Sequence, residues 1–178
     1  MVILPDGDQI EMRWKSVSYI FGQKKIVFSI VPMMNKADYV LVPNAEQWTK
    51  HLAIEKRNEI IVILQHVDWK REINIVEFDI PPYITDKKED LITPGSLEST
   101  EAGRKLEQDF LFDPTSPLNK EQVKEMFCIL EKRFAENTIG DVKILKGSII
   151  AGSVMAEISI PALEKNTKVN LCFIDKLE

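Results

Sequence analysis

Residues 10–31 read IEMRWKSVSYIFGQKKIVFSIV and carry the clearest structural pattern in the chain. Apolar and charged residues alternate from Ile10 to Lys15, which is the period-two pattern of a half-buried strand. Two apolar runs follow, one on each side of Gly22-Gln23-Lys24, and this arrangement predicts a hairpin with glycine in its turn. We therefore expect the chain to begin with an antiparallel sheet.

Later strands are expected wherever a β-branched apolar run is bounded by proline, glycine or polar residues. Proline residues mark the ends of several of these runs because proline cannot donate to a strand ladder. The expected strands are 38–42, 73–80, 142–145, 148–160 (with a kink or bulge at Gly152) and 169–174.

Helix starts are indicated by polar capping residues. Asn44 and Asn119 each precede a glutamine by three residues, the spacing of a reciprocal capping box. The helix that begins after Asn119 has the strongest apolar face, and Ser99 or Thr100 could begin a shorter one. Residues 58–67 are ambiguous, because their β-branched content favours a strand while their apolar spacing fits a helix. We interpret them as a helix.

These elements predict an α+β fold with a mainly antiparallel sheet, or two small sheets, and helices packed on one face. We expect a β-rich lobe with one or two helices over 1–80, a linker or long loop over 81–98, and a helical hairpin followed by antiparallel strands over 99–178. Whether the chain forms one domain or two small lobes stays open at this point.

Composition narrows the class of protein. The chain has 178 residues, of which 44% are hydrophobic, and a formal net charge of −5. This composition predicts a folded protein with a core of its own, and the acidic balance argues against a nucleic-acid partner. With two cysteines, no signal-peptide pattern at the N-terminus and no long apolar run, we expect a cytoplasmic protein with free thiols and no membrane partner.

Motifs for catalysis or metal binding are not recognisable in the sequence. The glycines do not form a phosphate-binding loop or a nucleophile elbow, and the two histidines lack metal-ligand spacing. The best enzymatic alternative is an acid-x-Lys element of Mg²⁺-dependent nucleases, in which the acid holds the metal and the lysine positions water. Asp141 and Lys143 are its best-placed example, with Asp113 as an upstream acid. We expect no cofactor and no metal.

One short cluster is a candidate binding surface. Asp68, Trp69, Lys70 and Arg71 place an aromatic side chain beside two cations, and tryptophan and arginine are over-represented at binding hot spots. The alternative is that Trp69 belongs to the core and the charges around it are solvated.

From these observations we carry three hypotheses for function. The first is a non-catalytic protein-binding module, for example a small acidic immunity protein, which neutralises a toxin, or an inhibitor, because complementary charge favours a basic partner. The second is a Mg²⁺-dependent nuclease-like enzyme that uses Asp141 and Lys143. The third is a homo-oligomeric regulatory or small-molecule-binding domain. The first best accounts for a sequence without catalytic motifs.

Overall fold

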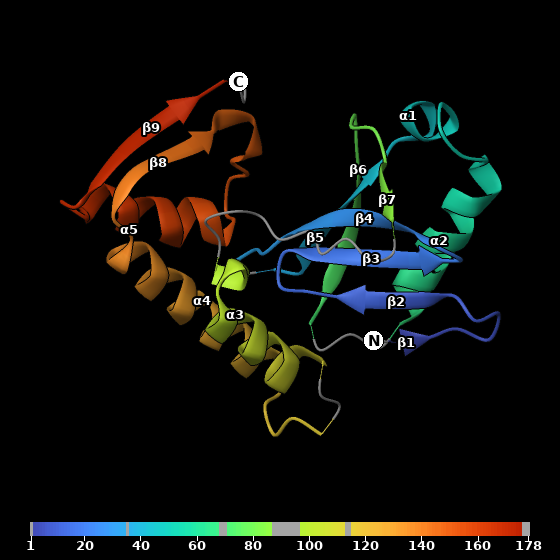
Figure 1. Cartoon of the computed structure of the whole chain (residues 1–178), viewed down its shortest axis with the longest axis horizontal. Helices are drawn as coiled ribbons and strands as arrows, with labels where there is room; N and C mark the ends of the chain where they lie inside the picture. Colours follow the sequence, from blue (N-terminus) through green and yellow to red (C-terminus); the bar gives the residue numbers. More distant parts are fainter. Residues whose placement is uncertain (1, 35, 68–70, 87–96, 113–114, 176–178) are drawn as a thin grey trace.

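A computed structural model describes residues 2–34, 36–67, 71–86, 97–112 and 115–175. In these residues the chain forms a large mixed sheet, mostly antiparallel, a small parallel sheet and five α-helices, with short 3₁₀ and π-helical turns (Figure 1). The expected α+β class is confirmed. Three separate clusters of buried apolar residues form the core: one under the large sheet, one around Trp14, and one under the small sheet.

The large sheet begins with the predicted hairpin. Strands β3 (Ser16–Phe21) and β4 (Lys24–Val31) pair in a register that leaves only Gly22 and Gln23 between them. Gly22 has a φ of 55°, a conformation that favours glycine, and stands first in the two-residue turn. Strands β2 (Gln9–Met12) and β1 (Val2–Ile3) extend the sheet outward from β3.

The other side of β4 is shared by two strands. Its C-terminal half pairs with β5 (Asp38–Pro43), which in turn pairs in parallel with β6 (Ile73–Phe78), the last strand in the sheet order. Its N-terminal half pairs with β7 (Tyr83–Asp86). The segment 81–98 was expected to be a linker or long loop, and this expectation was wrong over 83–86. These residues form β7 because four residues of β4 pair with them. Residues 87–96 lie outside the described residues.

Two helices connect β5 to β6 and pack on one face of the large sheet. The helix α1 (Ala45–Thr49) is capped by the Asn44 side chain, which accepts a hydrogen bond from the Gln47 N–H at 2.9 Å. The helix α2 (Ile54–His66) contributes the buried residues Ile60 and Leu64 to the sheet core. The ambiguous segment 58–67 is therefore helical as interpreted, because burying this apolar face offsets the lower helix propensity of its β-branched residues.

The second half of the chain opens with helices. They are the 3₁₀ turn η1 (Leu97–Ser99), α3 (Glu101–Leu106), the π-helical turn η2 (Glu107–Phe112) and α4 (Lys120–Asn137). Thr100 caps α3, and Asn119 and Gln122 form both hydrogen bonds of a capping box at α4. The apolar face of α4 packs around Trp14 from the first half of the chain, so the two halves share this cluster.

The last part of the chain differs most from expectation. Residues 148–160 are not a strand: Ser148 ends the 3₁₀ turn η3 (Lys146–Ser148), and the π-helical turn η4 (Met155–Ser159) leads into α5 (Ile160–Lys165). The Ser153 hydroxyl accepts a hydrogen bond from the Ala156 N–H, which starts this helical run, and proline is well suited to the first turn of α5.

This helical run changes the pairing of the final strands. β8 (Gly140–Leu145) and β9 (Val169–Ile174) form a parallel pair, whereas antiparallel strands were expected. Parallel neighbours need a crossover connection, and α5 supplies it while burying Ile160, Ala162 and Leu163 against α4 and β8. The division of the chain into lobes at 81–98 stays a prediction.

Candidate functional site

The predicted binding cluster is only partly within the described residues. Asp68, Trp69 and Lys70 lie outside them. Arg71 is described, and its side chain is buried with 3% exposure, so it is not the exposed surface cation that we expected. The parallel register of β5 and β6 explains this position, since Arg71 lies two residues before Ile73, the β6 residue that pairs with Asp38 of β5. The binding role of the cluster stays a prediction.

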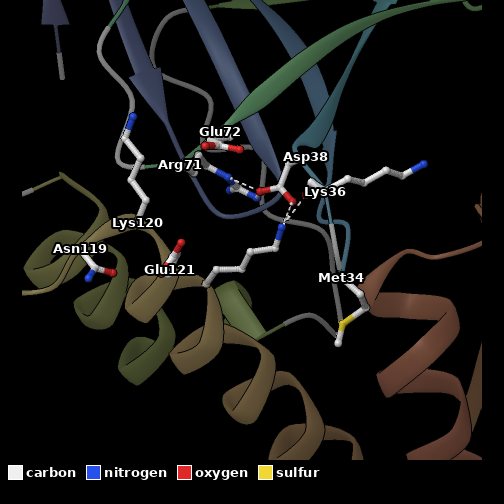
Figure 2. A pocket seen from close by; sticks show the side chains of 9 residues that line it. Met34, Lys36, Asp38, Arg71, Glu72, Asn119, Lys120 and Glu121 are labelled. Atoms are coloured by element: carbon white, nitrogen blue, oxygen red, sulfur yellow. Dashed lines mark hydrogen bonds and ion pairs between the residues drawn. The ribbon is translucent and has the colours of Figure 1, made fainter.

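Arg71 forms a buried ion pair with Asp38. Arg71 Nε donates to Asp38 Oδ2 at 2.7 Å, and Nη2 contacts the same oxygen. The other oxygen, Oδ1, accepts a hydrogen bond from the Met33 N–H at 2.7 Å and lies 3.4 Å from Lys124 Nζ of α4. Asp38 is 1% exposed, so one carboxylate joins β5, the start of β6 and α4 (Figure 2).

Arg71 also contacts the aromatic cluster between the two halves of the chain. Its guanidinium carbon lies 4.4 Å from the centroid of the Trp14 ring, and Nη1 donates to the Trp14 carbonyl at 2.6 Å. Trp14 stacks on Phe127 of α4 with 4.4 Å between ring centroids. Burial lowers the pKa of Arg71 from its ordinary value, and the charge of Asp38 opposes that shift.

Two further carboxylates are buried beside this junction. Glu107 Oε1 accepts a hydrogen bond from the Trp14 N–H at 2.7 Å, and Arg13 lies 3.6 Å from its other oxygen. Glu131 of α4 forms an ion pair with Lys15 at 2.7 Å. The buried acids at this junction therefore hold specific partners across it, which is the condition under which a buried charge is tolerated.

A cavity of about 610 Å³ opens above the Asp38–Arg71 pair, between the start of β5 and β6 and the first turns of α4 (Figure 2). Seven of its nine lining residues are charged. The lining residues are Met34, Lys36, Asp38, Arg71, Glu72, Asn119, Lys120, Glu121 and Lys124. No local sequence pattern predicted this cavity, because its residues come from three separate segments that only the β5–β6 pairing and the packing of α4 bring together.

The arrangement does not resemble a proton-transfer or nucleophilic site. Asp38, the buried acid of the cavity, is already engaged by two cations and a backbone N–H. Burial raises the pKa of the nearby Cys128 thiol, which disfavours the nucleophilic thiolate. Within the described parts of the chain, no three histidine, cysteine or acidic side chains are grouped to hold a metal ion.

The residues of the nuclease alternative lie far from this cavity in the sequence and occupy an exposed position on β8. Asp141 and Lys143 are both exposed, and Asp141 accepts a hydrogen bond from Asn170 of β9 at 3.0 Å. Asp113, the proposed upstream acid, lies outside the described residues. No geometry in the described chain supports metal chemistry at Asp141, and the nuclease hypothesis stays untested.

A second polar cluster ties the N-terminal strands to α2. The Tyr19 hydroxyl donates to Asp8 at 2.5 Å and accepts from Lys56 Nζ at 2.9 Å. Burial, together with the hydrogen bond to Asp8, raises the pKa of Tyr19 to about 12. Burial alone would lower the pKa of Lys56, but its hydrogen bonds to Tyr19, Glu59 and Asp8 raise it overall. These interactions are local and paired, so we assign the cluster a structural role.

The outer edge of β6 is the second candidate site. β6 is the terminal strand of the large sheet and reads INIVEF, with no proline and one charged residue. Phe78 at its end is 37% exposed, and Glu72, Glu77 and Asp79 border it as exposed acids. An apolar edge strand of this length is a template for pairing with another strand.

Comparisons with known proteins give no family. No protein-family model, no curated protein and no solved structure matches this chain. Among the helices of the described residues, none is long and apolar enough to cross a lipid bilayer.

Proposed function

We propose that this protein is a non-catalytic protein-binding module that takes an extended segment of its partner onto the open edge of β6. The observation that carries this proposal is the position of β6 at the end of the large sheet, with apolar residues along its length. An added strand forms hydrogen bonds with edge N–H and C=O groups that otherwise bond to water. Strand addition of this kind is a common mode of peptide recognition.

The backbone register defines which groups would meet the partner. The Asp38 N–H donates to the Glu72 carbonyl, and the Asn44 N–H donates to the Phe78 carbonyl. In a parallel ladder these two bonds direct the N–H and C=O groups of Asn74, Val76 and Phe78 toward β5. The same groups of Ile73, Ile75 and Glu77 therefore point away from the sheet, where a partner strand would pair with them.

The edge lacks the features by which proteins usually block unwanted pairing. Exposed edge strands are commonly shortened, bulged, or given a proline or an inward-facing charge. β6 has six residues and no proline, and its one charge, Glu77, is engaged by Arg57 of α2 at 2.6 Å. Among the described residues no strand covers this edge, which supports its use as a binding surface.

Charge around the edge indicates the chemistry of the partner. Glu72 and Asp79 lie at the two ends of β6 and are exposed, and the whole chain has a net charge of −5. A partner segment with basic residues flanking a β-branched core would be favoured by this field. A second copy of this chain would bring like charges together at the same edge, which disfavours self-pairing there.

The buried charged groups of the cavity are already paired with each other, which supports a binding role rather than a catalytic one. Its buried ionisable groups, Asp38 and Arg71, already form ion pairs or hydrogen bonds. Immunity proteins and inhibitors, which act by occupying a partner's surface, are concrete forms of the proposed class.

The experiment compares two substitutions at the same position. Glu77→Pro removes an outward N–H from the edge without removing a bond to β5, whereas Glu77→Ala keeps the N–H. Both lose the ion pair with Arg57, so the alanine variant is the matched control. We expect wild type and Glu77→Ala to retain one stoichiometric partner from a native lysate and Glu77→Pro to lose it.

Either of two results would contradict the proposal. One is that wild-type protein retains no stoichiometric partner. The other is that Glu77→Pro, folded by circular dichroism, retains the partner as well as Glu77→Ala does.

A further inference from the structure

We infer that the charged cavity between β5, β6 and α4 binds a small zwitterion, a molecule that carries both a carboxylate and an ammonium group, such as a free amino acid. This inference rests on the cavity, which shares only Glu72 with the acids that border the β6 edge. It goes beyond protein binding because it assigns a class of small-molecule ligand to a second site. This site has a mostly charged lining and lies between the two halves of the chain.

Size and polarity define the kind of ligand. The volume of about 610 Å³ falls within the range of small-molecule sites, roughly 300–1,000 Å³. Such sites are usually lined by apolar side chains, but of the nine described lining residues here only Met34 is apolar. Burying a large apolar ligand against charged side chains would cost their hydration without a compensating interaction. The cavity therefore suits a small hydrophilic ligand.

The floor of the cavity has an excess of positive charge. Arg71 and Lys124 share a single carboxylate, that of Asp38. Arg71 Nη2 is buried and paired with Asp38, whereas the Lys124 side chain is 23% exposed and can meet a ligand. The cavity also lies at the N-terminal end of α4, a helix of 18 residues whose dipole favours an anion there. These features favour a ligand carboxylate at the floor.

The rim carries charges of both signs. Glu72 approaches from the strand side and Glu121 from α4, and both are exposed, with Lys120 beside Glu121 (Figure 2). Two rim carboxylates attract an ammonium group and repel a dianion such as phosphate. A ligand with a carboxylate and an ammonium group matches both the floor and the rim, whereas a simple anion matches only the floor.

The experiment measures binding of a matched set of probes by thermal shift and then by calorimetry. The probes are the twenty common amino acids and inorganic phosphate as a simple anion. For alanine they include its two half-molecules, propanoate, which lacks the ammonium group, and ethylammonium, which lacks the carboxylate. We expect at least one amino acid to saturate the site below about 10 mM, and to bind roughly tenfold or more tightly than either half-molecule, because each charged contact contributes more than 1 kcal/mol.

Three variants locate the site. We expect Lys120→Gln and Glu121→Gln, both exposed at the first turn of α4, to weaken amino-acid binding by roughly tenfold. Lys132→Gln is the control, because Lys132 is exposed on the same helix and does not line the cavity. Its binding should equal that of wild type.

The inference is overturned by any of three results. These are the absence of saturable binding by every amino acid, binding of phosphate or propanoate as tight as that of the best amino acid, and equal losses in Lys132→Gln and the two variants at Lys120 and Glu121. Failure here leaves the β6 proposal untouched, since none of these variants alters that edge.

Discussion

Removing the Asp38 carboxylate should cost more stability than any other single charge change in the described chain. In Asp38→Asn the Arg71 guanidinium, 3% exposed, would lose the carboxylate that its Nε and Nη2 contact, and Lys124 would lose the same partner. Breaking a buried pair from one side typically costs about 3–5 kcal/mol, because a charge is left unpaired. Against a total stability of roughly 5–15 kcal/mol, this is a large fraction.

The assay is urea unfolding followed by tryptophan fluorescence, with the free energy of unfolding taken from the linear extrapolation. Glu46→Gln is the control, since Glu46 also forms an ion pair with a lysine, Lys50, but its side chain is 80% exposed. Exposed pairs contribute only about 0–1 kcal/mol. A loss below about 1 kcal/mol in Asp38→Asn would refute the argument that this carboxylate holds β5, β6 and α4 together.

Two further predictions concern the core and the Tyr19 cluster. Phe127→Ala should lower the free energy of unfolding in urea by about 3–5 kcal/mol, because Phe127 is 1% exposed and stacks on Trp14. Ile129→Ala, on the exposed side of α4, is the control and should cost far less. Equal losses in the two variants would contradict this packing. Tyr19 has a folded-state pKa of about 12 against an ordinary 10.0, so its contribution to stability is complete below pH 10 and is lost as pH rises toward 12. Tyr19→Phe should therefore reduce the loss of stability between these pH values, and an unchanged pH profile would contradict the assignment.

Sequence patterns correctly predicted the elements that depend on residues close together in the chain. The capping box at Asn119 and Gln122 and the hairpin at Gly22 depend on residues a few positions apart, and both are present. The segment 148–160 was read as a strand because its β-branched residues outweighed a helix start at Ser153. A parallel pair of strands requires a crossover connection between them. Because the helical crossover between β8 and β9 was not predicted, their parallel pairing could not be predicted either.

The candidate sites were missed for a different reason. Arg71 stands beside tryptophan and lysine in the sequence, which suggested a surface. Its actual partner, Asp38, is 33 residues away and meets it only because β5 and β6 pair in parallel. The open edge of β6 likewise depends on strand order, and strand order is set by pairing between distant segments rather than by the sequence of β6 itself.

The role of β6 can be measured by amide hydrogen exchange in the free protein and in its complex. In the free protein, the outward N–H groups of Ile73, Ile75 and Glu77 should exchange faster than those of Asn74, Val76 and Phe78, which point toward β5. We predict that the partner slows exchange at the outward groups specifically. Partner binding that leaves these three amides unprotected would contradict strand addition at β6.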